Sequence, residues 1–410
     1  KKQLKMFKIR QSKYRHVYCD QPKQAMCYHG MRVSADVGEH LGIKASTKYW
    51  SVSGAGGGGT LVVGRHDRPG RFLDGISPRL IGHSGSILDH DWNPFDDSMV
   101  ATGSEDATIK IWTIPDDWEP TGEDGMPKEG DSITDSQSLV TLDGHKKKVT
   151  LLQWHPSASN ILLSTSADNT TKVWDVSEGQ PISSYESSKA TQDIAWDARG
   201  EHYAISTKDK CIRIIDPRTG EETLVIEKAH DGSNAIKVQW LDDDGIEGKL
   251  VSTGSNNRNG REMKVWDLKD TSKPLHVEQI DNASGTLLPL FDKDTGVIYM
   301  CGKGHGQIRP YEYDENKTPR IFKLNDGFRS TTSGKGYCMI PKRGCDIMGC
   351  ETVRIMKVTN SDGIHPLSFI VPRKSEAFQE DLFPPAPAAA PAHSSDEWVA
   401  GSSQMPLTIS

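Results

Sequence analysis

Histidine, aspartate and hydroxyl side chains recur in this sequence at spacings that would suit nucleophilic hydrolysis. His83 precedes Asp106 by 23 residues, His145 precedes Asp168 by 23 residues, and Ser or Thr residues lie between each pair. A histidine placed between a carboxylate and a serine is the arrangement that activates a hydrolytic nucleophile. One such set is enough for an enzyme, whereas here the same residue types return at regular intervals. We therefore interpret the sets as structural and predict no catalytic residue and no enzymatic activity.

A structural role explains the recurrence because each set also includes a tryptophan that closes an apolar segment. A buried carboxylate must be paired or hydrogen-bonded, and a histidine, a hydroxyl and an indole N–H can supply the partners. We predict one hydrogen-bonded chain inside each repeat. Its predicted members are His83, Asp106, Trp112, His145, Asp168, Trp174, Asp209 and His230.

Short β-strands must position these side chains. Four apolar segments end in tryptophan, namely ILDHDW, VTLLQW, TQDIAW and AIKVQW. Each is followed by a turn, by a strand rich in Ser, Thr or Gly, and by a third strand such as IKIW or TKVW. A period of about 40–45 residues with Gly-His and Trp-Asp signatures is typical of WD repeats, which contribute four strands per blade.

Fainter copies on both sides of these four segments raise the number of repeats to seven. The predicted fold class is therefore all-β: a seven-bladed β-propeller over residues 1–361, with blades starting near residues 31, 79, 139, 181, 221, 273 and 319. Because an open sheet edge invites mispairing, we predict that residues 7–18 supply a strand that closes the ring. Residues 362–410 are predicted to be an extension that packs on the propeller and contains a Pro/Ala-rich linker.

Composition excludes several other classes of protein. No apolar run approaches the roughly 18 residues of a membrane span. The net charge is −7, and the positive charge gathers in residues 1–16, so nucleic acid is not a predicted partner. The acidic run over residues 115–138 is interpreted as a solvated loop inserted in the second blade. Seven cysteines without a CxxC pair indicate reduced thiols, no zinc site and no cofactor.

The sequence also resembles the coronin family over nearly its whole length. The resemblance is carried by RQSKYRHV near the N-terminus, by CYHGMRVS, and by VPRKSEAFQEDLFP after the last repeat. It implies a cytoplasmic protein of the actin cytoskeleton that binds F-actin and regulates the organisation and turnover of filaments. Coronins characteristically end in a coiled coil that oligomerises them and contacts the actin-nucleating complex. No heptad pattern occurs here, so we expect a truncated, monomeric chain from a homo-oligomeric protein.

The resemblance also implies which residues contact actin. Coronins use an arginine that corresponds to Arg32, in CYHGMRVS. The planar and permanently charged guanidinium suits an acidic partner surface. Lys13 and Arg15, in the basic N-terminal stretch, are predicted to extend the same patch.

Two other functions remain open from the sequence. The chain could be a general WD-repeat adaptor that binds a peptide instead of actin. It could also be a phosphoinositide-binding propeller that recognises anionic membrane lipids, since Lys342 and Arg343 are adjacent and the N-terminus is basic. The coronin-like tail argues against the adaptor, and the absence of the usual paired-arginine lipid motif argues against the second.

Overall fold

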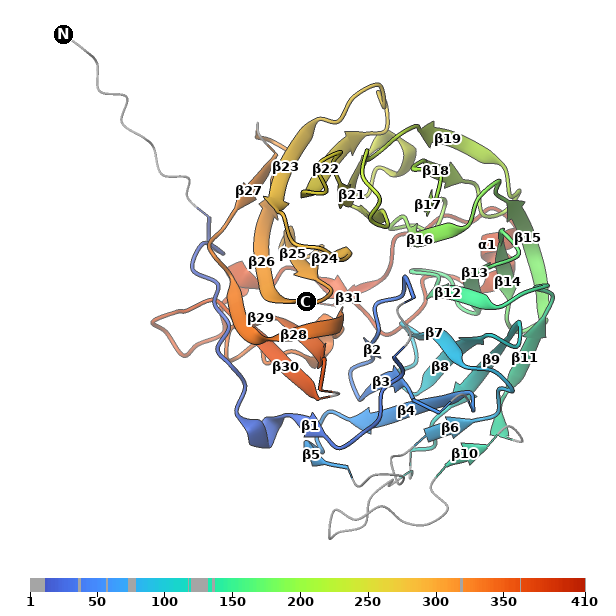
Figure 1. Ribbon diagram of the computed structural model, residues 1–410, viewed down its shortest axis with the longest axis horizontal. Helices are drawn as coiled ribbons and strands as arrows, with labels where there is room; N and C mark the ends of the chain where they lie inside the picture. The colour runs from blue at the N-terminus through green and yellow to red at the C-terminus, as the bar shows by residue number, and fades with distance from the viewer. Residues whose placement is uncertain are drawn as a thin grey trace.

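Seven blades surround a central channel in the structure, a computed structural model that describes residues 12–35, 38–56, 58–72, 79–116, 118, 132–134, 137–317, 320–361 and 363–409. Figure 1 looks down the channel and shows the blades following one another around the ring in chain order. The predicted all-β propeller is confirmed. Among the described residues, no helix is long and apolar enough to cross a membrane.

The first three blades are four-stranded antiparallel sheets whose strands follow one another along the chain. Their strands, from the channel outward, are β2 (Lys44–Ala45), β3 (Tyr49–Ser53), β4 (Thr60–Arg65) and β6 (Arg79–Ile81); β7 (Ile87–Trp92), β8 (Met99–Ser104), β9 (Thr108–Thr113) and β11 (Val140–Asp143); and β12 (Val149–Trp154), β13 (Ile161–Ser166), β14 (Thr170–Asp175) and β15 (Gln180–Glu186). At the rim, β10 (Ile133–Thr134) pairs in parallel with β6.

The fourth and fifth blades repeat this plan, and the last two share one sheet. Their strands are β16 (Thr191–Trp196), β17 (Tyr203–Thr207), β18 (Ile212–Ile215) and β19 (Glu222–Ile226); β20 (Lys237–Trp240), β21 (Lys249–Ser255), β22 (Arg261–Asp267) and β23 (His276–Asp281); β24 (Leu287–Asp292), β25 (Val297–Gly302), β26 (His305–Tyr313) and β27 (Ile321–Lys323); and β28 (Phe328–Met339), β29 (Glu351–Thr359), β30 (Ile364–Ile370) and β1 (Tyr28–His29). Because β26 pairs with both β27 and β28, the sixth and seventh blades join.

The remaining elements are short and lie at the rim or in the C-terminal extension. They are β5 (Gly70–Arg71), β31 (Ala386–Pro387), β32 (Thr408–Ile409), the 3-10 helices η1 (Gln24–Met26), η3 (Gly245–Glu247), η4 (Lys342–Gly344) and η5 (Glu380–Leu382), and the helix α1 (Ser395–Val399).

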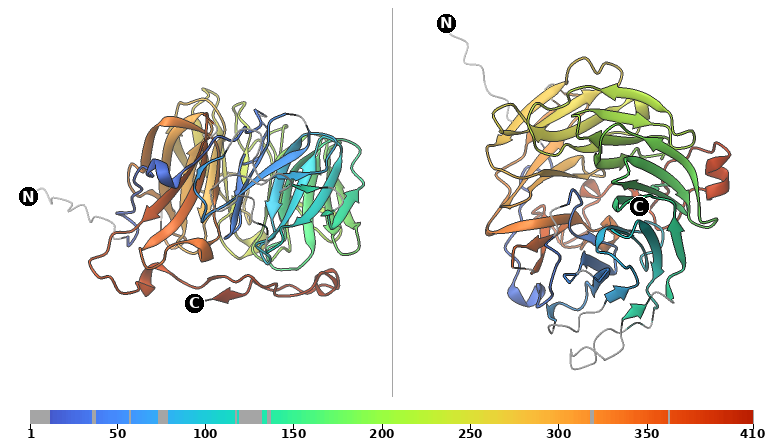
Figure 2. Two further views of the ribbon diagram at one scale, coloured as in Figure 1. Left: turned by 90° about the horizontal axis from the view of Figure 1, so that it is seen from below. Right: turned by 45° about the vertical axis from the view of Figure 1, so that its right-hand side comes forward.

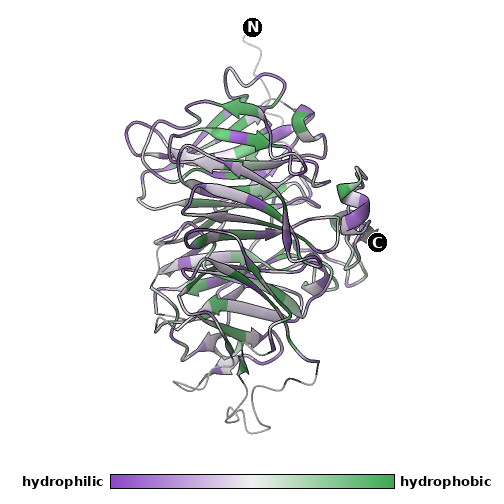
Figure 3. Cartoon of the chain, turned by 90° about the vertical axis from the view of Figure 1, so that its right-hand side faces the viewer, coloured by the Kyte–Doolittle hydropathy of each residue, from purple (hydrophilic) through white to green (hydrophobic). Residues whose placement is uncertain are grey.

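Burial decreases from the middle of each blade to its outer strand. All six residues of β13 are buried, because both of its faces pack against neighbouring blades. The outer strand β15 of the same blade has no buried residue. In Figure 3 the hydrophobic colour accordingly lies mostly on the strands. The core is therefore a series of apolar layers between adjacent blades.

Antiparallel strand order defines two faces of the disc. The top face carries the loops that lead from the outer strand of one blade to the inner strand of the next, together with the turns between second and third strands. The bottom face carries the turns between first and second strands and those between third and fourth strands. Every loop can therefore be assigned to a face from its place in the sequence.

The sequence repeat and the structural blade are offset by one strand. The predicted starts near residues 79, 139, 181, 221, 273 and 319 fall at or next to β6, β11, β15, β19, β23 and β27, which are the outer strands of the preceding blades. Each sequence repeat thus completes one blade and begins the next. This overlap links neighbouring blades through continuous chain.

The N-terminal part of the chain closes the ring, although with later residues than predicted. Tyr28 of β1 pairs with Ile364 of β30, and an isolated bridge joins Tyr18 to Ile370. Residues 7–11 lie outside the described part, and the predicted strand 7–18 contributes only the bridge at Tyr18 among the residues described. Residues 13–16 form a turn.

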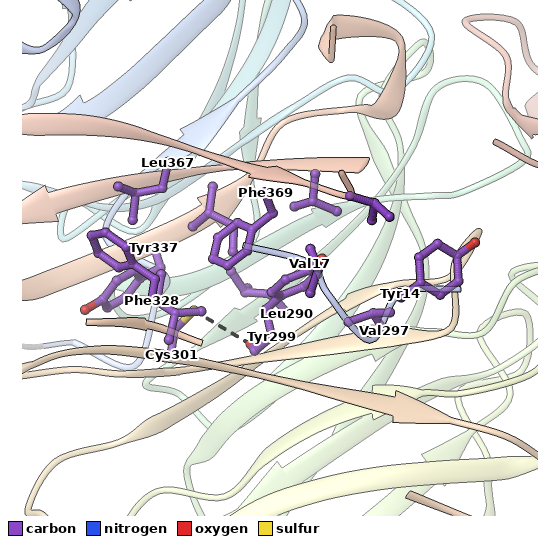
Figure 4. Packing of buried hydrophobic residues seen from close by; sticks show 14 of the residues in the cluster. Tyr14, Val17, Leu290, Val297, Tyr299, Cys301, Phe328, Tyr337, Leu367 and Phe369 are labelled. Carbon is purple, nitrogen blue, oxygen red and sulfur yellow. Dashed lines mark hydrogen bonds between the residues drawn. The ribbon is translucent and has the colours of Figure 1, made fainter. Parts of the chain in front are cut away.

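Side chains of that turn still contribute to closure. Figure 4 shows Tyr14 and Val17 beside Val297, Tyr299 and Phe369, from the sixth and seventh blades. Both N-terminal side chains are 3% exposed. The segment before β1 therefore closes the ring by apolar packing as well as by strand pairing.

The predicted domain boundary at residue 361 is wrong. The strand β30 pairs with β29 along its length and is the third strand of the seventh blade, so the propeller continues to Ile370. The pattern at Arg354–Met356 resembles the third strand of other repeats, but it lies in the second strand, β29. The C-terminal extension, residues 372–409, then crosses the bottom face, as the left view of Figure 2 shows.

Candidate functional site

The second blade contains a hydrogen-bonded chain of four side chains. The indole Nε1 of Trp112 donates to Thr102 Oγ1 at 2.9 Å, and that hydroxyl lies 2.8 Å from His83 Nε2. His83 Nδ1 lies 2.9 Å from Asp106 Oδ2. The loop before β7 positions His83 and the β8–β9 turn positions Asp106, so the chain ties the top face to the middle of the blade.

The third blade repeats this geometry. Trp174 Nε1 donates to Ser164 Oγ at 2.8 Å, Ser164 Oγ lies 2.7 Å from His145 Nε2, and His145 Nδ1 lies 3.3 Å from Asp168. The backbone N–H of Lys146 also donates to Asp168, at 2.8 Å. The carboxylate therefore fixes the loop before β12 as well as the histidine.

The fifth and fourth blades depart from the predicted pattern. His230 Nδ1 lies 2.9 Å from Glu262 Oε1, a carboxylate on β22 instead of in the preceding turn. Among the described residues Asp209 has no histidine partner; it accepts from Arg213 Nη2 at 2.7 Å. The prediction that Asp209 belongs to a histidine network is corrected, because Ser187 occupies the loop position where other blades carry histidine.

Electrostatics and burial show what these chains can do. Burial lowers the pKa of His83 and of His145, so both rings are neutral near pH 7. Burial raises the pKa of Asp106, but hydrogen bonds from Thr108 and the nearby His83 outweigh it and lower the pKa to about 2. Because Thr102 and Ser164 are fully buried, neither hydroxyl can meet a substrate. These hydrogen-bonded side chains stabilise the interior of each blade.

Arg32 lies at the top face of the first blade. Its carbonyl oxygen accepts from the N–H of Ala55 at 3.0 Å, and the neighbouring Val33 forms a bridge with Gly54. Ser34 N–H donates to Ser53 O at 2.8 Å. The backbone around Arg32 is thus fixed to the β3–β4 turn, while its side chain is exposed. A rigid loop presents the guanidinium to the outside.

Lys13 lies apart from Arg32, so the expected patch does not extend to it. Lys13 Nζ donates to the carbonyl oxygen of Asp381 in the C-terminal extension, which crosses the bottom face. Its ammonium is 5.3 Å from the ring centroid of Tyr14. Asn325 donates to Arg15 O at 3.2 Å, which places Arg15 beside the β27–β28 loop. Both side chains are exposed.

The two residues that suggested phosphoinositide binding are already engaged. Lys342 Nζ lies 2.6 Å from Asp292, and Arg343 Nη1 lies 3.0 Å from Asp97. Their side chains are only 12% and 18% exposed. These ion pairs join the seventh blade to the sixth and the second blades, so Lys342 and Arg343 act within the propeller.

The central channel encloses a cavity of about 290 Å³. Two ion pairs lie in it: Lys44 Nζ is 2.9 Å from Asp91, and Lys237 Nζ is 3.3 Å from Asp193. Asp193 also accepts from the N–H of Val238 on the next blade at 2.8 Å. Among the described residues, no group of three His, Cys, Asp or Glu side chains is arranged to hold a metal ion. The channel groups bind neighbouring blades to each other.

Trp398 is fully buried against the ring and anchors the extension. A Ser394–Glu397 capping box starts its helix. Sequence reasoning missed a group of exposed lysines on the top face, for which the run Lys146–Lys148 was the signal.

Family models match three parts of the chain. The model described as "WD domain, G-beta repeat" matches residues 76–113 and 136–175. The model described as "Type of WD40 repeat" matches residues 364–406, which in the structure are β30 and most of the extension. A "Domain of unknown function (DUF1899)" matches residues 7–71, which include Arg32.

Curated relatives match almost all of the chain. Coronin-2A of Homo sapiens is 37% identical over 410 residues, covering 98% of this chain and 74% of the human protein. The coronin-like protein crn1 of Schizosaccharomyces pombe is 35% identical over 400 residues, covering 97% of this chain. This chain spans 64% of the length of crn1.

Solved structures agree in fold. The WD40 domain of Toxoplasma gondii coronin superposes with a TM-score of 0.87 at 33% identity, covering 97% of both chains. A chain of the mitotic checkpoint complex superposes with a TM-score of 0.63 at 14% identity, covering 90% of this chain and 97% of that one, which reflects the propeller fold alone. The identity to coronins, sustained over nearly every residue described here, shows that this chain belongs to the coronin family.

Proposed function

We propose that this protein binds actin filaments through the top face of its propeller, with Arg32 as a principal contact, and so regulates filament organisation and turnover at the cytoplasmic actin cytoskeleton. No enzymatic activity is part of the proposal. The observation that carries it is the exposed arginine on a fixed turn in a chain that belongs to the coronin family.

The physical basis is a preorganised positive contact. The backbone of Arg32 is held by the β3–β4 turn, so binding need not order the loop. The guanidinium can form two parallel hydrogen bonds with a carboxylate, which an ammonium cannot. An acidic patch on the filament is the kind of surface that this side chain fits.

Filament co-sedimentation of the Arg32→Asp variant tests the proposal. Reversal of one central charge should weaken binding at least tenfold, because a hot-spot charge contributes about 2 kcal/mol or more. The apparent affinity of the unmodified protein should also fall as salt is added, since exposed charge pairs are screened within about 8–10 Å.

Lys273→Asp is the matched control. Lys273 is exposed in the β22–β23 loop on the bottom face, and its replacement changes the net charge by the same amount. The control should pellet normally, and both variants should melt as the unmodified protein does. If Arg32→Asp pellets as well as Lys273→Asp, Arg32 is not a filament contact.

A further inference from the structure

Basic residues are concentrated on the top face of the third, fourth and fifth blades. The top-face loops there are residues 144–148, 167–169, 187–190, 208–211, 227–236 and 256–260. They contain eight basic and four acidic residues. The basic residues are Lys146, Lys147, Lys148, Lys189, Lys208, Lys210, Lys228 and Arg258, and the acidic ones are Asp168, Asp209, Glu227 and Asp231. We call these eight residues the basic arc.

The bottom face of the same three blades has the opposite balance. Its turns are residues 155–160, 176–179, 197–202, 216–221, 241–248 and 268–275. They contain ten acidic residues and four basic ones. The acidic residues are Glu178, Asp197, Glu201, Asp216, Glu221, Asp242, Asp243, Asp244, Glu247 and Asp270. This half of the disc is therefore electrically polarised, with its positive side on the face that carries Arg32.

In the part of the molecule that the structure describes, the acidic residues of the top face leave most of the basic arc without an ion pair. Asp168 is bound by His145 and Asp209 by Arg213, so both serve the interior of their blades. Lys148 lies 4.0 Å from Glu105. Within the described part of the chain, the other exposed arc residues, namely Lys146, Lys147, Lys189, Lys208, Lys228 and Arg258, form no ion pair.

The backbone that carries these side chains is fixed. Ser166 Oγ donates to Lys147 O at 2.9 Å, and Ser187 Oγ donates to Lys189 O at 2.6 Å. The N–H of Lys208 donates to Ala190 O at 3.0 Å, which links adjacent loops. The positive groups therefore stand on a rigid platform, and a partner would not have to order the loops.

Two arc lysines occupy backbone conformations that disfavour them. Lys210 has a φ of 69° and Lys228 a φ of 48°, in the left-handed region. The turns equivalent to that of Lys210 place Ala107, Asn169 and Asn259 there, and asparagine tolerates this region better than lysine. A lysine kept at a strained position is the kind of outlier that points to function.

We propose that the basic arc is a second filament-contacting surface, which binds an acidic protein surface while Arg32 binds another. This inference rests on the proposed function and extends it. Figure 1 shows that the first blade and the fourth lie on different sides of the channel, and both positive sites are on the top face. A rigid disc with two such sites fits a polymer that presents acidic surfaces repeatedly.

A membrane is the less suitable partner. Among the described residues, none of the large hydrophobic side chains that are exposed lies in the arc loops. Amphipathic helices that bind bilayers bury apolar side chains beside their cations. The arc offers only charges and small polar residues, which suits a hydrated protein surface.

Paired charge reversal tests the arc. The variant Lys147→Glu with Lys189→Glu should raise the apparent Kd for filaments about tenfold and make its dependence on salt shallower. The matched control is Lys269→Glu with Lys273→Glu, two exposed bottom-face lysines whose reversal changes the net charge equally. The control should bind within twofold of the unmodified protein.

The strained lysine supplies a second test. Lys210→Asn should raise Tm by about 1–2 °C, because the left-handed conformation becomes less costly. The same variant should bind filaments about two- to threefold more weakly, because one arc charge is lost. If Lys210 has only a structural role, the substitution will change Tm and leave the affinity for filaments unchanged.

The outcomes separate the two proposals. If Arg32→Asp loses filament binding while both arc variants keep it, the arc inference is overturned and the proposed function stands. If the unmodified protein does not pellet with filaments, both the proposed function and the arc inference are overturned. Binding to vesicles of 30% phosphatidylserine in phosphatidylcholine completes the test. If the arc variants lose vesicle binding but keep filament binding, the arc inference is overturned, and the arc binds a lipid surface instead.

Discussion

At the scale of single residues, the same side chains that would form a hydrolytic site instead form the interior of blades. The difference is that a substrate cannot reach the hydroxyl group. In the second and third blades the hydroxyl between histidine and tryptophan is fully buried, and the indole N–H occupies one of its acceptor positions. The hydroxyl is therefore a junction that satisfies two buried polar groups.

Removing one such junction should be costly. Ser164→Ala would leave His145 Nε2 and Trp174 Nε1 without their shared partner, and we expect the free energy of unfolding to fall by about 2–4 kcal/mol. Urea denaturation measures the change. Ser184→Ala, on the exposed side of β15, is the control and should cost less than about 0.5 kcal/mol. Equal effects of the two changes would contradict the junction role.

Buried histidines should make the protein sensitive to acid. Burial lowers the pKa of His83 and His145, and lowers that of His90 and His155 to about 3. The unfolded chain binds protons at these rings below pH 6.5, and the folded chain does not, so stability falls as the pH falls. Each such histidine contributes a slope of up to about 1.4 kcal/mol per pH unit. Urea midpoints measured from pH 7.5 to 5 should decrease steadily; midpoints that stay constant would show that these rings are protonated in the folded state.

At the scale of elements, the ring depends on a closure made by residues distant in sequence. The strand β30 is paired with β29 on one side and with β1 and Tyr18 on the other. Without the N-terminal residues, β30 would become an open edge able to pair with other chains. The same N-terminal segment buries Tyr14 and Val17 against the last two blades.

Stepwise deletion separates the two contributions to closure. Removal of residues 1–18 deletes Tyr14, Val17 and the Tyr18 bridge and should sharply lower Tm; removal of residues 1–29 also deletes β1 and should lower it further. The control, removal of residues 1–11, leaves all of these contacts in place. Calorimetry with light scattering would record the melting and any aggregation. An unchanged Tm for the 1–18 deletion would refute a closing role for this segment.

At the scale of the whole molecule, the C-terminal extension fastens distant blades together across the bottom face. It leaves the seventh blade at Val371 and is anchored at the third and fourth blades. There the ring of Trp398 lies 5.1 Å from His155 and 4.6 Å from the guanidinium of Arg218, and its Nε1 donates to Gly200 O at 3.2 Å. The N–H of Ala392 donates to Ser157 O at 2.8 Å.

Loss of the anchor should release the extension before the ring unfolds. A fully buried tryptophan replaced by alanine can cost about 3–5 kcal/mol, which exceeds what a peripheral segment can lose while remaining docked. Trp398→Ala should therefore speed proteolysis within residues 372–409 at least tenfold and lower Tm only modestly. Val399→Ala, an exposed neighbour on α1, should behave as the unmodified protein. Equal protease resistance of the two variants would show that Trp398 is not the anchor.

The sequence by itself determined the repeat, and with it the fold class. In the second and third blades, a tryptophan near the end of the third strand and an aspartate in the turn before that strand recur, because both blades solve the same packing and hydrogen-bonding problem locally. Such local requirements leave a period that can be read along the chain. The resemblance that named Arg32 was likewise contained in a short contiguous segment.

Only the tertiary structure decided relations between residues that are distant in the chain. It moved the closing strand from residues 7–18 to β1 and Tyr18, and it extended the last blade through β30. It separated Lys13 from Arg32, and it gathered lysines from three blades on one face. The physical reason is that closure and surface charge depend on which faces meet around the ring, and the sequence pattern of a single blade contains no information about its neighbours.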